Sequence, residues 1–261
     1  MTDPALPGPA AWPEGVARHV LTQTESTNAE ALRLAPGLGG PAWIMTRMQT
    51  AGRGRRGRNW SMPPGNFAAS LALRPQGSPA DISLYSFVAA LALHEALSAA
   101  CGPAARLSIK WSNDLLLNGG KVAGILLEST GQGAAATALA VGIGVNLAAA
   151  PAPDSIEPGA IRPVSVLGET GLAISPDDFL DLLAPAFDGW QRRLATYGFG
   201  TIRNAWLARA ARLGETITAR TGSTTRIGRF EGIDDNGALV LVTAAGREVI
   251  PAADVFFDEV A

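Results

Sequence analysis

The chain has 261 residues, and 47% of them are hydrophobic, which is enough to bury the core of one large domain or of one large and one small domain. The formal net charge of −2 argues against a general nucleic-acid binder or membrane-surface binder, so any site for an anion has to be local. The single cysteine, Cys101, excludes an internal disulfide, and one Cys with two His residues excludes a Cys/His metal cluster.

The sequence predicts a flexible arm at residues 1–19. They lack the basic segment of a signal peptide and are interrupted by Pro4, Pro7, Pro9 and Pro13. The longest apolar run, Phe87–Leu93, is too short to span a bilayer. We therefore expect a cytoplasmic protein without a membrane partner, and the lone cysteine fits a reducing compartment.

The sequence predicts an α+β domain at residues 20–213, in which a mixed β-sheet has helices on one face. The pattern Thr27-Asn28-Ala29-Glu30 is that of a capping box and predicts a short helix that ends near Leu34. Hydrophobic patterns predict further helices at residues 84–100, 176–197 and 201–213, with Pro185 kinking or dividing the second of these. Strands are expected at residues 42–47, 67–74, 107–111, 122–128 and 138–146, the last two separated by a turn at residues 131–133.

Residues 214–261 predict a smaller β domain. Short alternating patterns indicate strands at residues 216–220, 226–232, 238–243, 248–251 and 255–257. The turns Asp235-Asn236-Gly237 and Ala245-Gly246 separate some of these strands. We interpret this segment as a small β-barrel.

An arginine-rich glycine loop follows the strand predicted at residues 42–47. The segment Gly52-Arg53-Gly54-Arg55-Arg56-Gly57-Arg58 formally matches the dinucleotide fingerprint, but residues 59–65 after it contain two prolines and cannot start the helix which that motif requires. One alternative is a plain solvated run of charge. We favour a loop that is mobile alone and becomes ordered on an anion, because guanidinium groups bind phosphate and carboxylate well and otherwise repel one another.

Both lysines of the chain lie in one short segment. Lys110 ends a predicted strand and Lys121 begins another, just after the hairpin signal Asn118-Gly119-Gly120, so we expect the hairpin to bring the lysines together. Lys121 can neutralise charge on a phosphoryl or acyl-phosphate oxygen, and Asp114 can orient a cation or bind Mg²⁺. The alternative makes Lys121 a solvent-facing strand end and Asp114 a turn residue.

Three glycines interrupt predicted strands: Gly124, Gly142 and Gly144. A glycine inside a strand often marks the close approach of a ligand or of another backbone, so these bare faces can make room for a flat ring. Bulges or tight curvature of the sheet explain each glycine equally well when it is taken alone.

Five segments, in order, resemble the biotin protein ligase family: Ser26-Thr27-Asn28, Gln49 to Trp60, Lys110-Trp-Ser-Asn-Asp114, Lys121-Val-Ala-Gly-Ile125 and Gly142-Ile-Gly-Val-Asn146. The resemblance covers roughly residues 20–257. It implies a catalytic domain with the class II synthetase-like mixed sheet, followed by an SH3-like barrel. The implied reaction uses Mg²⁺, biotin and ATP to make biotinyl-5′-AMP. A lysine of a biotin carboxyl carrier protein, from acetyl-CoA carboxylase or another biotin-dependent carboxylase, then takes the biotinyl group.

The resemblance also implies a role for each matching residue. Binding of biotin or its adenylate is assigned to Ser26, Thr27, Asn28, Gln49, Gly52, Arg53, Gly54, Arg55, Arg56, Trp60, Lys121, Gly124 and Ile125. Within that set, Lys121, Arg53 and Arg55 are the catalytic candidates, and Trp60 is the aromatic lid. The nucleotide side is assigned to Asn113, Asp114 and Asn146. The resemblance leaves the metal ligands unassigned.

Two features depart from parts of the family. Ser112 stands where the family usually has proline, so the turn before Asn113 is expected to be less rigid. Nothing before residue 20 resembles the winged helix-turn-helix of the repressor branch, so we expect a monofunctional enzyme that does not bind DNA and that can form a homodimer.

Two other functions remain as alternatives. A lipoate or octanoate ligase shares the implied architecture, although the arginine loop and the Lys-Trp-x-Asn-Asp turn favour biotin. A non-enzymatic nucleic-acid-binding module could use the arginine loop and the barrel, but the sequence pI of about 5.7 disfavours it.

Overall fold

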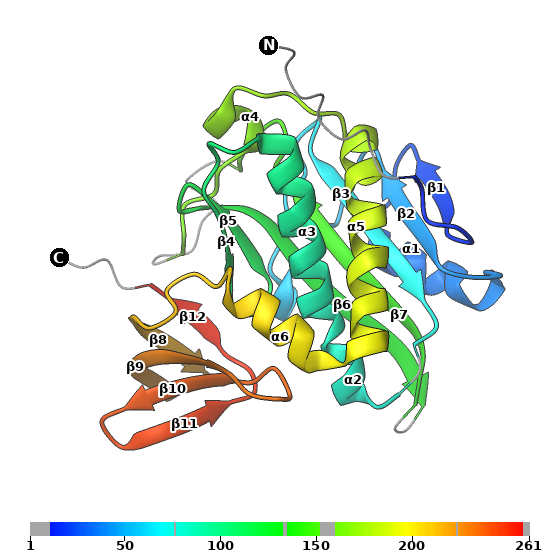
Figure 1. Cartoon of the computed structure of the whole chain (residues 1–261). Coiled ribbons are helices and arrows are strands. Elements are labelled where there is room, and N and C mark those ends of the chain that lie inside the picture. The colour runs from blue at the N-terminus through cyan, green and yellow to red at the C-terminus, as the bar shows by residue number, and fades with distance from the viewer. Residues whose placement is uncertain (1–10, 76, 133–134, 152–159, 223, 258–261) are drawn as a thin grey trace, which may run out of the picture.

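The computed structural model describes residues 11–75, 77–132, 135–151, 160–222 and 224–257. Two β-sheets organise this part of the chain, and Figure 1 shows the larger one covered by two long helices and the smaller one at the C-terminal end. Residues 1–10 of the expected arm lie outside the described residues. The arm prediction is wrong for Ala17 to His19, because these residues belong to a strand that pairs with a neighbour.

The larger sheet has seven strands in the order β1-β2-β3-β7-β6-β5-β4. Their bounds are β1 Ala17–Leu21, β2 Ala42–Thr46, β3 Phe67–Leu73, β4 Leu107–Lys110, β5 Asp114–Leu117, β6 Gly120–Gln132 and β7 Ala135–Val145. Strands β1 and β2 are parallel and the other neighbouring pairs are antiparallel, so the predicted mixed sheet is confirmed. Every residue of β2 and β3 is buried, because both faces of the sheet are covered there.

Helices cover the two faces of this sheet unequally. The long helices α3 (Tyr85–Cys101) and α5 (Pro176–Tyr197) pack together on one face, next to the short helices α2 (Pro79–Ser83) and α6 (Phe199–Leu207) (Figure 1). Helix α1 (Thr27–Leu34) lies on the opposite face, where Ala31 joins a small buried cluster with Ile44 and Ala140. Helices therefore occupy both faces, which corrects the expectation of one.

Helix α3 lies at the centre of the main core. Together with α2 it is long and apolar enough to cross a membrane by length and composition alone, but most of its residues are buried against α5 and the sheet. Helix α5 begins at the N-cap Ser175, whose hydroxyl accepts a hydrogen bond from the backbone N–H of Asp178. It continues unbroken past Pro185, so that proline does not divide it. A short helix, α4 (Val166–Thr170), precedes it.

The smaller sheet is antiparallel, with the order β11-β10-β9-β8-β12. Its bounds are β8 Thr216–Thr221, β9 Thr224–Ile233, β10 Leu239–Thr243, β11 Gly246–Ile250 and β12 Asp254–Phe256, which agrees with the predicted small barrel. Trp206 of α6 lies in edge-to-face contact with Phe87 of α3 and Phe230 of β9. The Trp111 indole N–H donates to the carbonyl of Gly237, so aromatic side chains join the two sheets.

Three local predictions differ from the structure. Strand β5 lies where only a turn and a hairpin were expected, because its four residues are too short a run to stand out. Strand β6 extends through Gln132, so residues 131 and 132 of the predicted turn belong to the strand, and residue 133 lies outside the described residues. Helix α6 ends at Leu207 rather than near residue 213, because residues 208–214 form the turns that lead into β8.

Candidate active site

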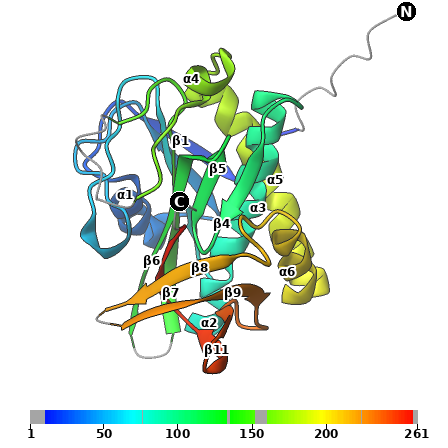
Figure 2. The ribbon, with the colours of Figure 1, turned by 90° about the vertical axis from the view of Figure 1, so that its left-hand side faces the viewer.

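A cavity of about 440 Å³ lies beside the middle of the larger sheet and reaches the smaller one. It is lined by α1, the arginine loop, strands β4 to β7 and the segment that contains β12. Figure 2 shows the smaller sheet lying beside the β4 and β5 end of the larger sheet, which is why both sheets contribute to one cavity. The cavity's volume falls in the range of small-molecule sites.

One end of the cavity is formed by the N-terminus of α1. Ser26 is the N-cap and accepts from the backbone N–H of Ala29, so the cap lies one residue earlier than the capping-box pattern implied. The Thr27 backbone N–H donates to Gln49 Oε1 at 2.9 Å, which joins the helix to the loop after β2. Thr27 and Asn28 are buried, so their polar groups are fixed before any ligand enters.

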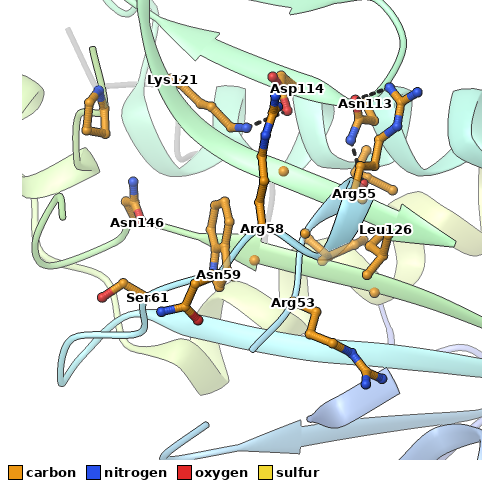
Figure 3. A pocket seen from close by; sticks show the side chains of 18 of the residues that line it. Arg53, Arg55, Arg58, Asn59, Ser61, Asn113, Asp114, Lys121, Leu126 and Asn146 are labelled. Carbon is orange, nitrogen blue, oxygen red and sulfur yellow. Dashed lines mark hydrogen bonds and ion pairs between the residues drawn. The ribbon is translucent and has the colours of Figure 1, made fainter. Parts of the chain in front are cut away.

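All four arginines of the loop contact carboxylate, amide or hydroxyl groups elsewhere in the protein. Arg53 pairs with Glu128 of β6, and Arg55 donates to Ser112 Oγ at 3.0 Å and to Asn113 Oδ1 at 3.2 Å. Arg56 and Arg58 both contact Asp254 of β12. Figure 3 shows Arg53, Arg55 and Arg58 extending from the loop in different directions around the cavity. The repulsion that predicted a mobile loop is thus offset inside the protein by carboxylates that lie far away in the sequence.

The two lysines lie close together, as the hairpin signal predicted, and they share one carboxylate. Asp114 Oδ1 lies 2.7 Å from Lys121 Nζ, and Asp114 Oδ2 lies 3.8 Å from Lys110 Nζ. Burial lowers the pKa of the Lys110 ammonium, and the nearby Asp114 carboxylate acts against that shift. The Lys121 ammonium also lies 5.8 Å from the centroid of the Trp60 ring. Cations, a carboxylate and an aromatic ring therefore meet at one point of the cavity.

The strand glycines are needed for close approach. A Cβ built on Gly144 would lie 2.4 Å from the Trp60 ring, and one on Gly124 would lie 3.2 Å from it. A Cβ on Gly142 would lie 2.2 Å from Asn28 Oδ1. The interpretation of close approach is thus supported over simple curvature, but the groups that approach these glycines are Trp60 and Asn28.

The polar residues of the predicted nucleotide side are held by backbone groups. Asn113 Nδ2 donates to the carbonyl of Ile125 at 2.8 Å, and Asn146 Nδ2 donates to the carbonyl of Val164 at 3.1 Å. The peptide bond between Trp111 and Ser112 is cis. Asn113, Asp114 and Asn146 all line the cavity.

The cavity brings together all of the predicted site residues except two. Gly52 and Arg56 do not line it, because Gly52 packs under Gln49 and Trp60 while Arg56 turns toward Asp254. The site assigned from the sequence left out other lining residues, among them Arg58, Asn59, Ser61, Lys110, Gly142, Gly144 and residues 253–256. The scarcity of lysine already marked Lys110, and the glycine pattern already marked Gly142 and Gly144, but neither signal gave these residues a role in the site. No motif marked residues 253–256.

The described residues contain no group of three or more His, Cys, Asp or Glu side chains that could hold a metal ion. Asp114 is the cavity's central carboxylate and is already paired with lysines. A single carboxylate fits an ion that arrives on nucleotide phosphates, because Mg²⁺ keeps several waters and needs only one or two protein carboxylates.

Comparisons with known proteins agree with this geometry. The family model described as "Biotin/lipoate A/B protein ligase family" matches residues 20–146, and the one described as "Biotin protein ligase C terminal domain" matches residues 213–258. A biotin–[acetyl-CoA-carboxylase] ligase of Paracoccus denitrificans is 68% identical over 238 residues, which cover 91% of this chain and 99% of that protein. The bifunctional ligase/repressor BirA of Bacillus subtilis is 33% identical over 81% of this chain and 65% of its own length.

Solved structures share the fold. A biotin protein ligase from Aquifex aeolicus, in complex with biotin and ATP, superposes with a TM-score of 0.76 at 24% identity and covers 92% of this chain and 97% of its own. A biotin protein ligase from Leishmania major, in complex with biotinyl-5-AMP, gives a TM-score of 0.56 at 25% identity and covers 90% of this chain and 99% of its own.

Proposed function

The chain belongs to the biotin protein ligase family, and we propose that it carries out the family's reaction in the cavity between its two sheets. It is a ligase that uses ATP to join biotin to a biotin carboxyl carrier protein through biotinyl-5′-AMP. The family model for residues 20–146 also covers lipoate ligases, but the Paracoccus denitrificans relative that is 68% identical is a biotin–[acetyl-CoA-carboxylase] ligase.

The observation that carries the site assignment is the convergence on one cavity of the arginine loop, the Lys121–Asp114 pair and the polar end formed by Thr27 and Gln49. The first two groups suit phosphate, and the third suits a small polar ring. Adenylation of biotin needs both kinds of site side by side, because the carboxylate of the bound ring compound has to reach the α-phosphate.

In the first step, the biotin carboxylate attacks the α-phosphate of ATP, and pyrophosphate leaves. Both reactants are anions, so positive charge has to screen them before an in-line approach is possible. Lys121, Arg53 and Arg55 supply that charge in our proposal. The Asp114 carboxylate holds the Lys121 ammonium at 2.7 Å, which limits its motion and reduces the reorganisation needed in the transition state.

Mg²⁺ remains a proposal. The ion would neutralise phosphate charge, and Asp114 is the residue that we propose to hold it when nucleotide is bound. Lys110, which also contacts Asp114, would then keep net positive charge beside the phosphates.

In the second step, a lysine amine of the carrier protein attacks the carbonyl of the mixed anhydride, and AMP leaves. Water would destroy the same anhydride, so the intermediate has to be covered until the carrier arrives. We propose that the arginine loop and Trp60, which lie over the sheet here, form this cover.

The remaining assignments are also proposals. We propose a catalytic domain at residues 20–213 and a barrel domain at residues 214–261 that contributes Asp254 to the site. We also propose a cytoplasmic location; the single helix among the described residues that is long and apolar enough to cross a membrane is mostly buried in the core. A homodimer is proposed as well, and sedimentation equilibrium with and without biotin measures it.

The test of function uses the full chain and labelled pyrophosphate. Biotin-dependent exchange of label into ATP, without exchange when lipoate replaces biotin, supports the proposal. Transfer of labelled biotin to a carrier domain with ATP and Mg²⁺ completes the test. Exchange that depends on lipoate, or on neither acid, contradicts the assignment.

A further inference from the structure

A hydrogen-bond chain through the core joins Gln49 to Arg53, although both belong to the same loop. From Gln49 the chain runs to Thr27, whose hydroxyl lies 2.8 Å from Ser70 Oγ of β3. Ser70 Oγ lies 2.6 Å from Asn28 Oδ1, and Asn28 Nδ2 donates to Glu128 Oε2 at 2.8 Å. The other oxygen of Glu128 lies 3.4 Å from Arg53 Nη2. Ser70 and Glu128 do not line the cavity, so they touch the site only through these neighbours.

The number of hydroxyl protons available determines which groups donate and which accept along this series of hydrogen bonds, and in particular what Thr27 does. An amide oxygen only accepts, so the single proton of the Ser70 hydroxyl has to go to Asn28 Oδ1. The close contact between Ser70 and Thr27 then requires Thr27 to donate its own proton to Ser70. Thr27 Oγ1 and Gln49 Oε1, which are 3.3 Å apart, are left as two neighbouring acceptors. Two acceptors suit a ligand N–H group, and the ureido ring of biotin carries such groups.

Asn28 is fixed in this orientation on every side. Its amide N–H groups donate to Glu128 Oε2 and to the carbonyl of Leu126, and the residue is only 4% exposed. Gly142 leaves the space that the amide occupies, since a Cβ there would lie 2.2 Å from Asn28 Oδ1. Asn28 therefore transmits the orientation of Glu128 to Ser70 rather than offering its amide hydrogens to a ligand.

We propose that Ser70 and Glu128 are positioning residues: Ser70 sets Thr27 as an acceptor for biotin, and Glu128 links that end of the cavity to Arg53 of the loop. This inference rests on the proposed function, because it names the groups that hold the biotin site in place. Loop closure and biotin recognition then share one hydrogen-bonded unit.

Ser70→Ala tests the first half. The Thr27 proton becomes free to turn toward Gln49 Oε1, so one acceptor is lost and the KM for biotin rises on the order of 10-fold, while the KM for ATP stays unchanged. Ser165→Ala is the matched control: it also removes a buried hydroxyl, in this case one outside the cavity that accepts a hydrogen bond from the backbone N–H of Gly168. A lower melting temperature with an unchanged KM for biotin overturns the proposal for Ser70.

Glu128→Gln tests the second half. Glutamine has one acceptor oxygen, so it can serve Asn28 or Arg53 but not both. Whichever way the amide turns, the link is cut, and we expect free biotinyl-AMP to leave the enzyme several-fold faster. Glu128→Ala loses both bonds and should also raise the KM for biotin. Glu95→Gln is the control, because Glu95 accepts a hydrogen bond from the Trp190 indole and neither residue lines the cavity.

The outcomes separate this inference from the proposed function. If the unmutated chain shows no biotin-dependent pyrophosphate exchange, the proposed function fails. If it does exchange, and the Ser70 and Glu128 variants keep the KM for biotin and the release rate of the unmutated chain, only the positioning roles fail. Should Ser70→Ala not fold, Glu128→Ala carries the test of biotin KM, because Glu128 is partly exposed and acts on the same amide of Asn28.

Discussion

Arg56 and Asp254 form an ion pair that joins the arginine loop to the smaller sheet, with Arg56 Nη1 2.5 Å from Asp254 Oδ2. Arg58 Nη2 lies 3.3 Å from the same oxygen, and the Asp254 side chain is only 13% exposed, so solvent screens these contacts less than it screens a surface pair. Arg56 has a φ of +56°, a left-handed conformation that costs a non-glycine residue roughly 1–2 kcal/mol. The ion pair offsets that strain, so the smaller sheet holds the second half of the loop in place.

The first prediction follows for Asp254→Asn. With the carboxylate gone, the loop opens more often, and bound biotinyl-AMP should leave about 5- to 10-fold faster, the change expected for losing about 1 kcal/mol of partly buried ion pairing. Rapid filtration of enzyme that holds labelled intermediate measures this rate.

Asp235→Asn is the control for that prediction, because Asp235 is also on the smaller domain, forms an ion pair with Arg203 and is 91% exposed. Slower release from Asp254→Asn would contradict the anchoring role. It would mean that Asp254 competes with the ligand phosphate for the two arginines.

The second prediction concerns Lys121, whose ammonium lies 2.7 Å from Asp114 Oδ1. Lys121→Ala removes the cation proposed to stabilise charge on the phosphate, so the rate of adenylate formation should fall by on the order of 10²-fold or more. Lys121→Arg keeps the charge but spreads it over a planar group, and it should recover only part of the rate. Adenylate formation by the alanine variant at the unmutated rate would remove Lys121 from the mechanism.

The third prediction concerns retention of the intermediate by Arg55. Its guanidinium binds Ser112 and Asn113, so it fastens the first half of the loop to the turn before β5. Arg55→Ala should release free biotinyl-AMP faster and increase biotin transfer to lysines of bystander proteins. Western blotting with streptavidin measures this labelling. Arg192→Ala is the control, because that arginine is 69% exposed and pairs only along α5. Unchanged retention by Arg55→Ala would argue against a lid.

The fold was predictable where one local pattern decided the structure. Alternation and turn residues placed most strands, and β9, β10 and β11 are separated at the two turns that the sequence marked, at residues 235–237 and 245–246. Strand β5 was missed because Asp114 to Leu117 is too short to show a period, and its pairing with β4 and β6 comes from the sheet. Strand β1 was partly assigned to the arm, because each of its residues pairs with a residue of β2 that lies 25 positions later in the sequence, and no local pattern shows that pairing.

The candidate site was predictable where motifs mark it and unpredictable where distant carboxylates complete it. The loop, the lysines and the strand glycines stand out in the sequence, and all but Gly52 and Arg56 among the predicted residues line the cavity. The residues that neutralise or orient them, Glu128, Asp254 and Ser70, are ordinary members of strands. Only tertiary pairing shows what they touch.

The fourth prediction concerns acid stability. Asp177, at the start of α5, pairs with Arg18 of β1 and with Arg47, and the Arg47 guanidinium is the main cause that lowers the pKa of Asp177 below its ordinary 3.8. A carboxyl group whose pKa is lowered by folding stabilises the folded state above its ordinary pKa, and that stability is lost as the pH falls through the lowered value.

Asp177→Asn should therefore unfold at a lower urea concentration than the unmutated chain at neutral pH, and the difference should shrink once the pH falls below the ordinary pKa of Asp177. Both chains are measured by urea titration across the acid range, with Asp188→Asn as the control for a helix-surface pair within α5. Because solvent reaches both partners of the Asp177 pairs, the effect should be small and should weaken in high salt. A difference that persists unchanged into the acid range would mean that the Asp177 carboxylate charge does not tie α5 to β1.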